Sequence, residues 1–373
     1  MLALADPILG ELEKQAVLEV LESKWLTMGE KVKIFEQNFA ALHQVPQAIA
    51  VNSCTAGLHI GLAALGIGPG DEVLVPSLTF VATINAVLYV GATPVFVDIE
   101  SLTEPHISLS QAKAHCTPKT KAVIIMHYGG YVMDIPAWRA FADERGLYLL
   151  EDVAHAPGAP GVGLLSDVSV FSFFSNKNMT TAEGGMVIAL DEAVGNRVRA
   201  LRTHGMTTTT LDRHKGHAYS YDVTMLGFNY RLDELRAAIG IVQLGFLPTW
   251  NQKRVQLSAQ YRTLLAQQCP SITIPFTATS PTVGHLMPVL LPSGVTRPKV
   301  MDQLRAEQIQ SSIHYPPAHH FSWYQTHYPS VSLPLTEQFS ATELSLPLHP
   351  GMTEQDVSRV VATLATIVAD CPQ

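Results

Sequence analysis

Residues 48–76 read AIAVNSCTAGLHIGLAALGIGPGDEVLVP, and this stretch contains the unit that decides the fold. The first four residues are apolar and predict a short buried strand. TAGLHIGLAALG then has apolar residues at helical spacing and ends in glycine, a residue that commonly ends helices. GDEVLVP predicts a turn followed by a second strand. A strand, a helix and a strand in this order are typical of parallel strands joined by a crossover helix.

The same alternation continues through the first two thirds of the chain. Further strands are predicted at ATPVFVDI (92–99), KAVIIMH (121–127), LYLLEDVAH (147–155), SDVSVFSFF (166–174) and GGMVIAL (184–190), with helices at FVATINAVLYVG (80–91) and IPAWRAFADERG (135–146). The second helix has proline near its start and glycine at its end, which supports its limits. The chain is therefore predicted to be an α/β protein whose mostly parallel sheet is covered by helices on both faces.

The pattern changes at about residue 246. A helical segment is predicted at roughly 250–268, strands around HLMPVLL (285–291) and SSIHY (311–315), and a C-terminal helix over 353–370. We therefore predict a large domain over residues 1–245 and a smaller α+β domain over residues 246–373.

Composition limits the classes of partner. The chain has 373 residues, 47% of them hydrophobic and 15% charged, with a net charge of −8 and no block of basic residues. This balance argues against nucleic acid or an anionic membrane surface as the main partner. The N-terminal residues lack the features of a signal peptide, and we expect no membrane span. Four scattered cysteines without metal or disulfide spacing predict a cytoplasmic protein with free thiols: Cys54, Cys116, Cys269 and Cys371.

One acidic and one basic side chain lie at the end of a predicted strand, in LLEDVAHAPGA. Asp152 and His155 lie where this strand gives way to a loop, the edge at which open α/β sheets bind ligands. By themselves they are equally well interpreted as a helix cap and a surface histidine.

A single lysine, Lys177, lies in FSFFSNKNMTTAEGGMV (171–187). Desolvation in a partly apolar turn lowers the pKa of an amine, and a neutral amine attacks aldehydes. Most lysines are simply solvated. However, a lysine that forms a Schiff base and an aspartate that holds a pyridine nitrogen are the two groups that pyridoxal phosphate (PLP) needs. Together with Asp152, Lys177 predicts a PLP site.

PLP also needs a site for its phosphate, and NSCTAGLHIG (52–61) offers one. A helix that begins near Thr55 directs backbone N–H groups at an anion, and the Thr55 hydroxyl is expected to cap it. GIGPGD (66–71) follows a helix and precedes a strand, so it is interpreted as a connection. Phe80, just past a strand end, is predicted either to stack on a flat cofactor or to pack in the core.

Several blocks in this order resemble the DegT-type nucleotide-sugar aminotransferases, which are fold type I PLP enzymes. They include ESKWLTMGEKVKIFEQNFA, the stretch from AVNSCTAGLHIG to FVATINAV, EDVAHAPGA, FSFFSNKNMTTAEGGMV, LGFNYRLDELRAAIGIVQL, SSIHYPP and LSLPLHPGMTEQDV. The resemblance covers nearly the whole chain. It implies an aspartate aminotransferase-like large domain with a mostly parallel seven-stranded sheet and a smaller C-terminal α+β domain. It also leaves about the first 20 residues free to pack on the small domain.

The resemblance implies a role for each matching position. Lys177 matches the Schiff-base lysine, which holds PLP as an internal aldimine and shuttles a proton. Asp152 matches the partner of the pyridine nitrogen, and His155 a residue that hydrogen-bonds the ring hydroxyl. The remaining expectations are phosphate contacts at Thr55, Ala56 and Ser172, ring stacking at Phe80, and a contact from Asn229 or Arg231 to the phosphate side of the other subunit's site. The last of these implies a homodimer.

Two positions depart from the family pattern. Phe174 stands where many members have histidine, and Ala182 replaces the first glycine of the common TTGEGG. Alanine would be strained at positive φ, so we expect that Ala182 does not adopt it. Lys177 separates the chain from the family's dehydratase branch, which has histidine there.

A second loop is rich in histidine. His314, His319, His320 and His327 lack the ligand spacing of a metal site, so no metal is predicted. The resemblance makes HYPP a substrate-side loop, where His314 and Tyr315 either touch the sugar nucleotide or serve in packing and capping.

The predicted reaction is ping-pong transfer of an amino group from an amino acid, with glutamate the expected donor, to a keto-sugar nucleotide. Such chemistry feeds polysaccharide and amino-sugar biosynthesis. Alternatives are a keto-cyclitol or other non-nucleotide ketone as acceptor, a PLP-dependent dehydratase, and a PLP-binding regulator without turnover. Loops around residues 25–30, 205–222 and 314–325 are expected to decide the substrate.

Overall fold

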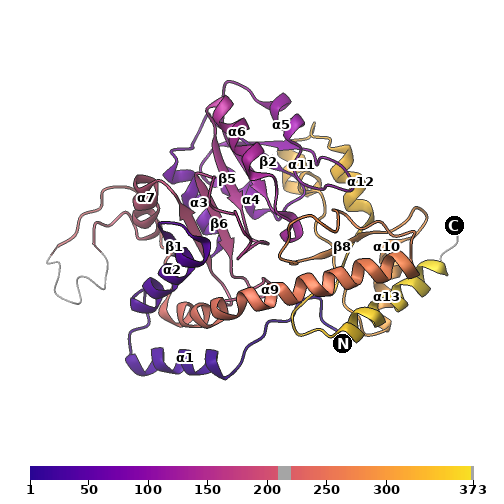
Figure 1. Cartoon of the computed structure of the whole chain (residues 1–373). Helices are drawn as coiled ribbons and strands as arrows, with labels where there is room; N and C mark the ends of the chain where they lie inside the picture. The colour runs from indigo at the N-terminus through magenta and orange to yellow at the C-terminus, as the bar shows by residue number, and fades with distance from the viewer. Residues whose placement is uncertain (209–219, 371–373) are drawn as a thin grey trace.

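The computed structural model describes residues 1–208 and 220–370, so Cys371 and part of the 205–222 loop lie outside the described residues (Figure 1). Its main feature is a seven-stranded sheet in the order β1-β7-β6-β5-β4-β2-β3. The strands are β1 (Ala48–Val51), β2 (Glu72–Pro76), β3 (Thr93–Val97), β4 (Thr120–Met126), β5 (Tyr148–Asp152), β6 (Val168–Ser172) and β7 (Gly185–Ala189). Only β7 pairs antiparallel with its neighbours. The prediction of a mostly parallel, seven-stranded α/β fold is confirmed.

Helices cover both faces of this sheet. One face packs against α2 (Glu30–His43), α5 (Leu109–His115), α6 (Ile135–Arg145) and the first part of α9 (Glu234–Gln268). The other packs against α3 (Cys54–Ala64), α4 (Ala82–Tyr89) and α7 (Glu192–Arg202). A further helix, α1 (Glu11–Ser23), lies along α9, as Figure 1 shows.

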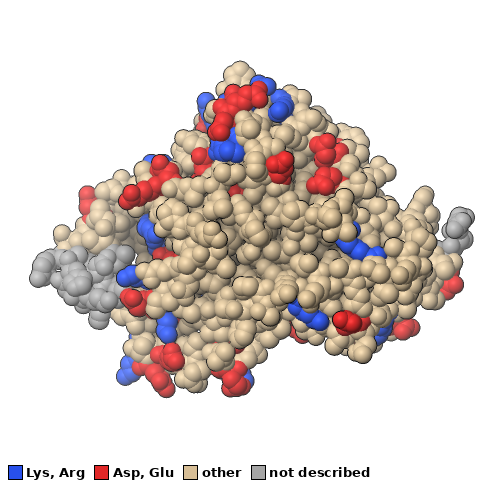
Figure 2. Space-filling view, viewed as in Figure 1, with Lys and Arg blue, Asp and Glu red and all other residues tan. Residues whose placement is uncertain are grey.

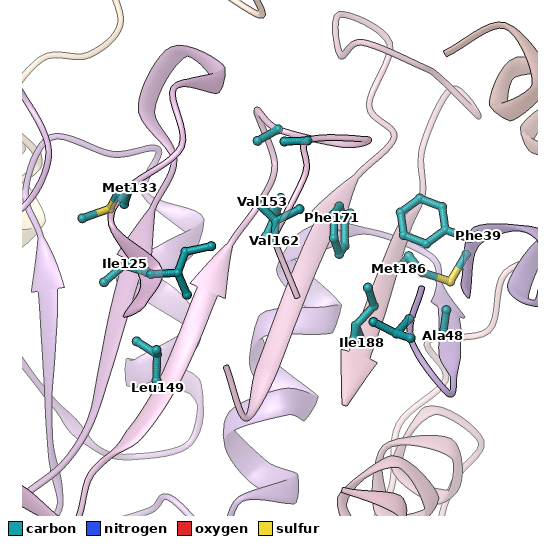
Figure 3. Close-up of a cluster of buried hydrophobic side chains, with 14 of the residues drawn as sticks. Phe39, Ala48, Ile125, Met133, Leu149, Val153, Val162, Phe171, Met186 and Ile188 are labelled. Carbon is teal, nitrogen blue, oxygen red and sulfur yellow. The ribbon is translucent and has the colours of Figure 1, made fainter. Parts of the chain in front are cut away.

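Successive residues of a strand belong to opposite faces, and both faces are apolar. In β1, Ala48 and Ala50 join one hydrophobic cluster while Ile49 and Val51 join the other. Figure 3 shows the first cluster, in which Phe171 of β6 and Phe39 of α2 lie close together. Their ring centroids are 4.9 Å apart, in an edge-on arrangement. Burial on both faces is the reason that these strands read as continuous apolar runs in the sequence.

Helix α3 packs closely against the sheet, with glycine at two of the positions that face it. A Cβ atom on Gly57 would come within 2.6 Å of a Val170 methyl group, and one on Gly61 within 2.9 Å of Val168. These separations are shorter than carbon atoms tolerate, so the two positions require glycine. The close packing fixes the N-terminus of α3 beside the ends of β6 and β7.

The C-terminal part of the chain forms a third hydrophobic cluster around the second half of α9. It contains β8 (Met287–Leu290) paired antiparallel with β9 (Glu343–Leu346), flanked by α10 (Arg297–Ala306) and α13 (Glu354–Ala369). Two shorter helices, α11 (Ser322–His327) and α12 (Pro334–Thr342), lie nearer the main sheet (Figure 1).

Three details of this part differ from the sequence-based expectation. The long helix begins at Glu234, not near residue 250, and therefore runs continuously across the proposed domain boundary at residues 245 and 246. SSIHY does not form a strand; it makes a single bridge between Ser312 and Ser345. The partner of β8 is instead β9, which the sequence pattern did not indicate. The division at residue 246 stays a proposal.

The N-terminal residues reach the C-terminal part. Leu2 forms a parallel bridge with Ile309, and the N–H of Leu348 donates to the carbonyl oxygen of Leu4. The side chain of Gln243 in α9 then holds the segment that follows, donating to the Ile8 carbonyl and to Glu13. About the first ten residues thus lie on elements that come much later in the sequence.

Charges are sparse on the surface. Figure 2 shows acidic and basic residues mostly toward the margins of the viewed face, with a largely uncharged centre. Among the described residues, no helix combines the length and the apolar character that a membrane crossing needs.

Candidate active site

A cavity of about 390 Å³ lies at the carboxyl ends of β5 and β6 and at the N-terminus of α3. It brings together most of the residues that the sequence singled out: Thr55, Phe80, Asp152, His155, Ser172, Lys177, His314 and Tyr315. Ala56, Asn229 and Arg231 do not line it. A larger hollow of about 620 Å³ beside Arg297 and Arg305 holds none of the predicted residues, so size alone would have pointed to the wrong place.

Asp152 is the last residue of β5 and is 4% exposed. Its Oδ1 accepts the backbone N–H of Ala154 at 3.0 Å, and its Oδ2 accepts the hydroxyl of Thr83 at 2.7 Å. Burial raises the pKa of the carboxyl, whereas the hydrogen bonds from Thr83 and Ala154 and the charge of Lys177 oppose that rise. The oriented, partly compensated carboxylate is suited to face a cationic ring nitrogen.

Lys177 lies in the loop between β6 and β7, where its backbone N–H donates to the carbonyl of Phe174 at 2.9 Å. Desolvation lowers the pKa of its amine from 10.5 to about 8, against the opposing effect of Asp152. A substantial fraction of the amine is therefore neutral near physiological pH, which is the form that attacks an aldehyde.

His155 is buried and its tautomer follows from its partners. The N–H of Gly129 donates to Nδ1 at 3.2 Å, so Nδ1 is the unprotonated nitrogen. Nε2 then carries the proton and donates to the hydroxyl oxygen of Tyr315 at 2.9 Å. Burial lowers the pKa of His155 well below its ordinary value, with Lys177 adding to the effect, so the ring is neutral. A neutral N–H donor directed into the cavity suits a ring hydroxyl.

Tyr315 and His314 reach the cavity from the loop that follows residue 310. The N–H of His314 donates to Glu343 at 2.8 Å, and its Nδ1 lies 2.8 Å from the hydroxyl of Ser345. Burial raises the pKa of Glu343 to about 8. The Tyr315 ring lies 6.2 Å from that of Phe80, whose side chain is 56% exposed. Phe80 is therefore a cavity wall with an open face, not a core residue.

The opposite end of the cavity is the start of α3. The helix begins at Cys54 and is capped by Ser53, whose hydroxyl accepts the N–H of Ala56 at 3.1 Å. The expectation that Thr55 caps this helix was wrong, because Thr55 lies inside it. Ser53, Thr55 and Ser172 all line the cavity at this end. A helix N-terminus with three hydroxyl groups is a suitable site for phosphate.

Ala182 corrects a second expectation. Its φ is +67°, the left-handed region that the sequence analysis had expected it to avoid. Local hydrogen bonds hold this conformation, since the Ala182 N–H donates to Thr180 Oγ1 at 2.9 Å and its carbonyl accepts from Ser175 at 3.3 Å. The left-handed residue turns the chain from the Lys177 loop into β7.

Sequence reasoning missed several residues of the site. Thr83 lies in an unremarkable helical segment, and its bond to Asp152 depends on how α4 packs against the sheet. Cys54, Asn176 and Glu183 line the cavity as well. Burial raises the pKa of the Cys54 thiol well above its ordinary value, so it is a neutral wall residue. Only Cys54 had a usable signal, because it directly precedes the position at which the phosphate-binding helix was expected to begin.

Asn229 and Arg231 lie outside the cavity of this chain. The backbone of Asn229 pairs with Thr203, and its carbonyl accepts from the side chain of Asn52 at 3.4 Å. The Asn229 residue is exposed and Arg231 is partly buried. Neither residue lines the cavity of its own chain, so either could contact a cofactor only if that cofactor were bound to another subunit.

The site's donor set fits PLP. Lys177 would provide the amine, Asp152 the carboxylate for the ring nitrogen, His155 an N–H for the ring hydroxyl, and the start of α3 a place for the phosphate. Gly185 leaves room for the start of α3, because a Cβ atom at this position would lie 2.8 Å from the Cys54 backbone nitrogen.

Comparison with known proteins identifies the chain. The sequence profile of the DegT/DnrJ/EryC1/StrS aminotransferase family matches residues 7–365. The chain belongs to this family. It is 38% identical to the spore coat polysaccharide biosynthesis protein SpsC of Bacillus subtilis (strain 168), across 97% of this chain and 96% of that protein. The family assignment confirms the resemblance drawn from the sequence blocks.

Solved structures agree with the family assignment. Helicobacter pylori PseC, an aminotransferase involved in pseudoaminic acid biosynthesis, superposes with a TM-score of 0.91, at 28% identity and over 99% of both chains. Bacillus subtilis NtdA with bound cofactor PMP superposes with a TM-score of 0.88, at 30% identity, over 97% of this chain and 83% of NtdA. Members of the family are PLP-dependent aminotransferases, and this chain is therefore one.

Proposed function

We propose that this aminotransferase moves an amino group from an amino acid, with glutamate as donor, to a keto-sugar nucleotide. The observation that carries the proposal is that one cavity contains the Lys177 amine, with its pKa of about 8, and the buried carboxylate of Asp152. A carbohydrate acceptor is supported by SpsC, which is named for polysaccharide biosynthesis.

The roles of the chain's own groups follow from their positions. When bound, PLP supplies an electron sink that makes the donor's Cα–H acidic and carries the amino group between the two half-reactions. We assign to Nζ of Lys177 the removal of that proton as a general base and its return as a general acid. Asp152 is assigned to keep the ring nitrogen protonated, and Thr83 to keep Asp152 ionised and oriented.

The other cavity residues are assigned to binding. Ser172, Thr55 and the first backbone N–H groups of α3 are proposed to hold the phosphate, and His155 the ring hydroxyl. The N–H of Ala56 is donated to Ser53, so Ala56 would contact the phosphate only if that cap opened. Phe80 is proposed to stack on the ring, and Tyr315 and His314 to lie on the acceptor side. Phe174 lines the same cavity, at a position where many relatives have histidine.

We further propose that the enzyme is a cytoplasmic homodimer. The position of Asn229 and Arg231 outside their own cavity supports this, because it leaves them available to the phosphate end of a partner's site. A mixed-dimer experiment tests it. Chains with Lys177→Ala and chains with Arg231→Ala, inactive or impaired alone, should regain activity when refolded together, because one of the two sites is then intact. A parallel mixture with Asn229→Ala identifies which residue makes the contact; no recovery in either mixture contradicts shared sites.

The reaction is tested by absorption spectroscopy of the purified protein before and after glutamate is added. The wild type should show the visible band of lysine-bound cofactor and lose it with glutamate, and Lys177→Ala should lack the band. A panel of keto-sugar nucleotides and keto-cyclitols is then offered to the aminated enzyme. If the band returns with a keto-cyclitol and with no keto-sugar nucleotide, the acceptor is a keto-cyclitol. If glutamate leaves the band unchanged and another amino acid removes it, that amino acid is the donor.

A further inference from the structure

Two adjacent histidines and a glutamate meet on the surface outside the candidate active site. His319 and His320 belong to the short 3-10 helix η2 (Ala318–His320), and Glu337 to α12. Nε2 of His319 lies 3.1 Å from Oε1 of Glu337, and Nε2 of His320 lies 3.7 Å from the same oxygen. The sequence predicted no metal site here, because the histidines lack ligand spacing. The third group, Glu337, lies 18 positions after His319 and was not part of that prediction.

The separations of the three side chains suit a small divalent ion. One ligand atom from each residue lies within 4.8 Å of the other two. A tetrahedral zinc ion, with bonds of about 2.0–2.2 Å to nitrogen and oxygen, places its ligand atoms roughly 3.3–3.5 Å apart. The two histidine–glutamate separations fall on either side of that value, so side-chain rotations alone would complete the arrangement.

A hydrogen bond fixes the orientation of the His319 ring, as binding of a metal ion requires. Its Nδ1 lies 2.7 Å from the hydroxyl of Ser77, the residue that follows β2. Histidines that bind metals usually have their second ring nitrogen hydrogen-bonded in this way, because it fixes both the ring's orientation and its tautomer. The Ser77 hydroxyl also lies 3.4 Å from the His319 backbone nitrogen, which donates to it.

The site is accessible from solvent on one side only. His319 is buried, at 1% side-chain exposure, whereas the side chains of His320 and Glu337 are 47% and 34% exposed. An ion could therefore enter past His320 and meet a ligand that is already fixed at the base. Glu337 is also positioned, because its Oε1 accepts the N–H of Leu333 at 2.9 Å.

We propose that His319, His320 and Glu337 form a binding site for a divalent transition metal ion of the zinc type, with a fourth position open to water. Two imidazoles and one carboxylate favour zinc, cobalt or nickel over magnesium or calcium, which prefer all-oxygen sites. None of the three residues lines the candidate active site. A bound ion would tie the segment that follows Tyr315 to α12 and, through Ser77, to the end of β2.

The test uses the PLP-loaded, full-length protein without an affinity tag, treated with a chelator and then titrated with Co²⁺. Tetrahedral cobalt gives intense visible bands, and zinc should displace it. We expect one tight site per chain, at least ~10-fold weaker binding in Glu337→Gln and His320→Ala, and a ~10–100-fold loss in Ser77→Ala, which removes only the orienting group. The matched control is His327→Ala, an exposed histidine on the neighbouring α11.

The variants must first show the wild-type circular dichroism and cofactor absorption, so that misfolding is not read as lost binding. Zinc should also raise the melting temperature of the wild type and of His327→Ala, but not of Glu337→Gln, because a ligand stabilises only the state that binds it. The proposal is overturned if the wild type gives no tetrahedral cobalt bands. It is equally overturned if Glu337→Gln and His320→Ala bind cobalt as tightly as His327→Ala does.

Discussion

The hydroxyl of Thr83 donates a 2.7 Å hydrogen bond to Oδ2 of Asp152, joining α4 to the end of β5. The Thr83 hydroxyl oxygen in turn lies 2.8 Å from that of Thr79. Because Thr83 donates to the carboxylate, its oxygen accepts the proton of Thr79. Two threonines thus support the carboxylate that is proposed to face the cofactor nitrogen, and the first of them lowers its pKa.

Replacement of Thr83 by valine should therefore raise the pKa of Asp152. A hydrogen bond to a charged group contributes about 1.5–3 kcal/mol, which corresponds to roughly one to two pKa units. Since the carboxylate acts in its ionised form, activity is lost as pH falls through its pKa, and this acidic limb should move to higher pH in Thr83→Val. The pH profile of kcat measures the shift. Thr79→Val, which keeps the direct bond, should move the limb much less; equal shifts would mean that the direct bond has no special role.

Tyr315 and a cofactor hydroxyl would compete for the same proton on His155. Nδ1 of His155 accepts from Gly129, so the ring has only the Nε2–H to donate, and in this structure it donates to Tyr315. Tyr315→Phe should therefore leave PLP affinity within about threefold of the wild type or improve it, whereas His155→Phe should weaken it about tenfold. Equilibrium titration of the cofactor-free enzyme measures both. If Tyr315→Phe weakens PLP binding as much as His155→Phe does, Tyr315 itself holds the cofactor.

The lowered pKa of Lys177 predicts how cofactor capture depends on pH. The neutral amine is the nucleophile, so the rate at which cofactor-free enzyme captures PLP should rise with pH and level off above about 8. Below that pH the rate should fall about tenfold per pH unit, because the protonated fraction grows. Stopped-flow absorbance measures the rate, and free lysine treated identically corrects for the titration of PLP itself. A rate that continues to climb toward pH 10, as for the free amine, would show that burial does not depress this pKa.

Ala182 offers a test of backbone strain. A φ of +67° destabilises a folded alanine by about 1–2 kcal/mol. Glycine has no such strain, but its greater freedom in the unfolded chain opposes folding by about 0.5–1 kcal/mol. Ala182→Gly should therefore raise the free energy of unfolding by up to about 1 kcal/mol, measured by urea denaturation of the holoenzyme. The control is Ala140→Gly, at an exposed position inside α6, which should lower it by about 1 kcal/mol. A loss of stability in both variants would show that Ala182 is not strained.

Much of the fold was predictable because it is written in local patterns. The apolar run, the glycine-ended helix and the second strand predicted in residues 48–76 are β1, α3 and β2 of the structure. The sequence pattern also predicted β5, which ends at Asp152, and β6, which ends at Ser172. Asp152 was singled out by its place at the end of a predicted strand and Lys177 as an amine in a partly apolar turn, and the family resemblance supported both. These features depend on neighbours within a few residues, so the sequence alone carries them.

The errors arose where a local pattern permits more than one outcome. The cap of α3 shifted from Thr55 to Ser53, because either hydroxyl suits a helix start and the backbone decides between them. Ala182 adopted positive φ, because its hydrogen bonds to the Lys177 loop outweigh the intrinsic preference of alanine. SSIHY formed a single bridge, between Ser312 and Ser345, because β9 and not SSIHY pairs with β8.

The sequence by itself thus determined the alternating strands and helices of the main sheet, and it singled out Lys177 and Asp152 as candidate reactive residues. Only the tertiary structure brought Thr83 to Asp152 across 69 positions, Tyr315 to His155 across 160, and Glu337 to His319 across 18. Such pairs depend on how elements pack in three dimensions, and side-chain contacts between distant segments leave no periodic pattern along the chain. The physical reason is that periodicity records which face of an element is buried, whereas packing decides which side chain it meets there.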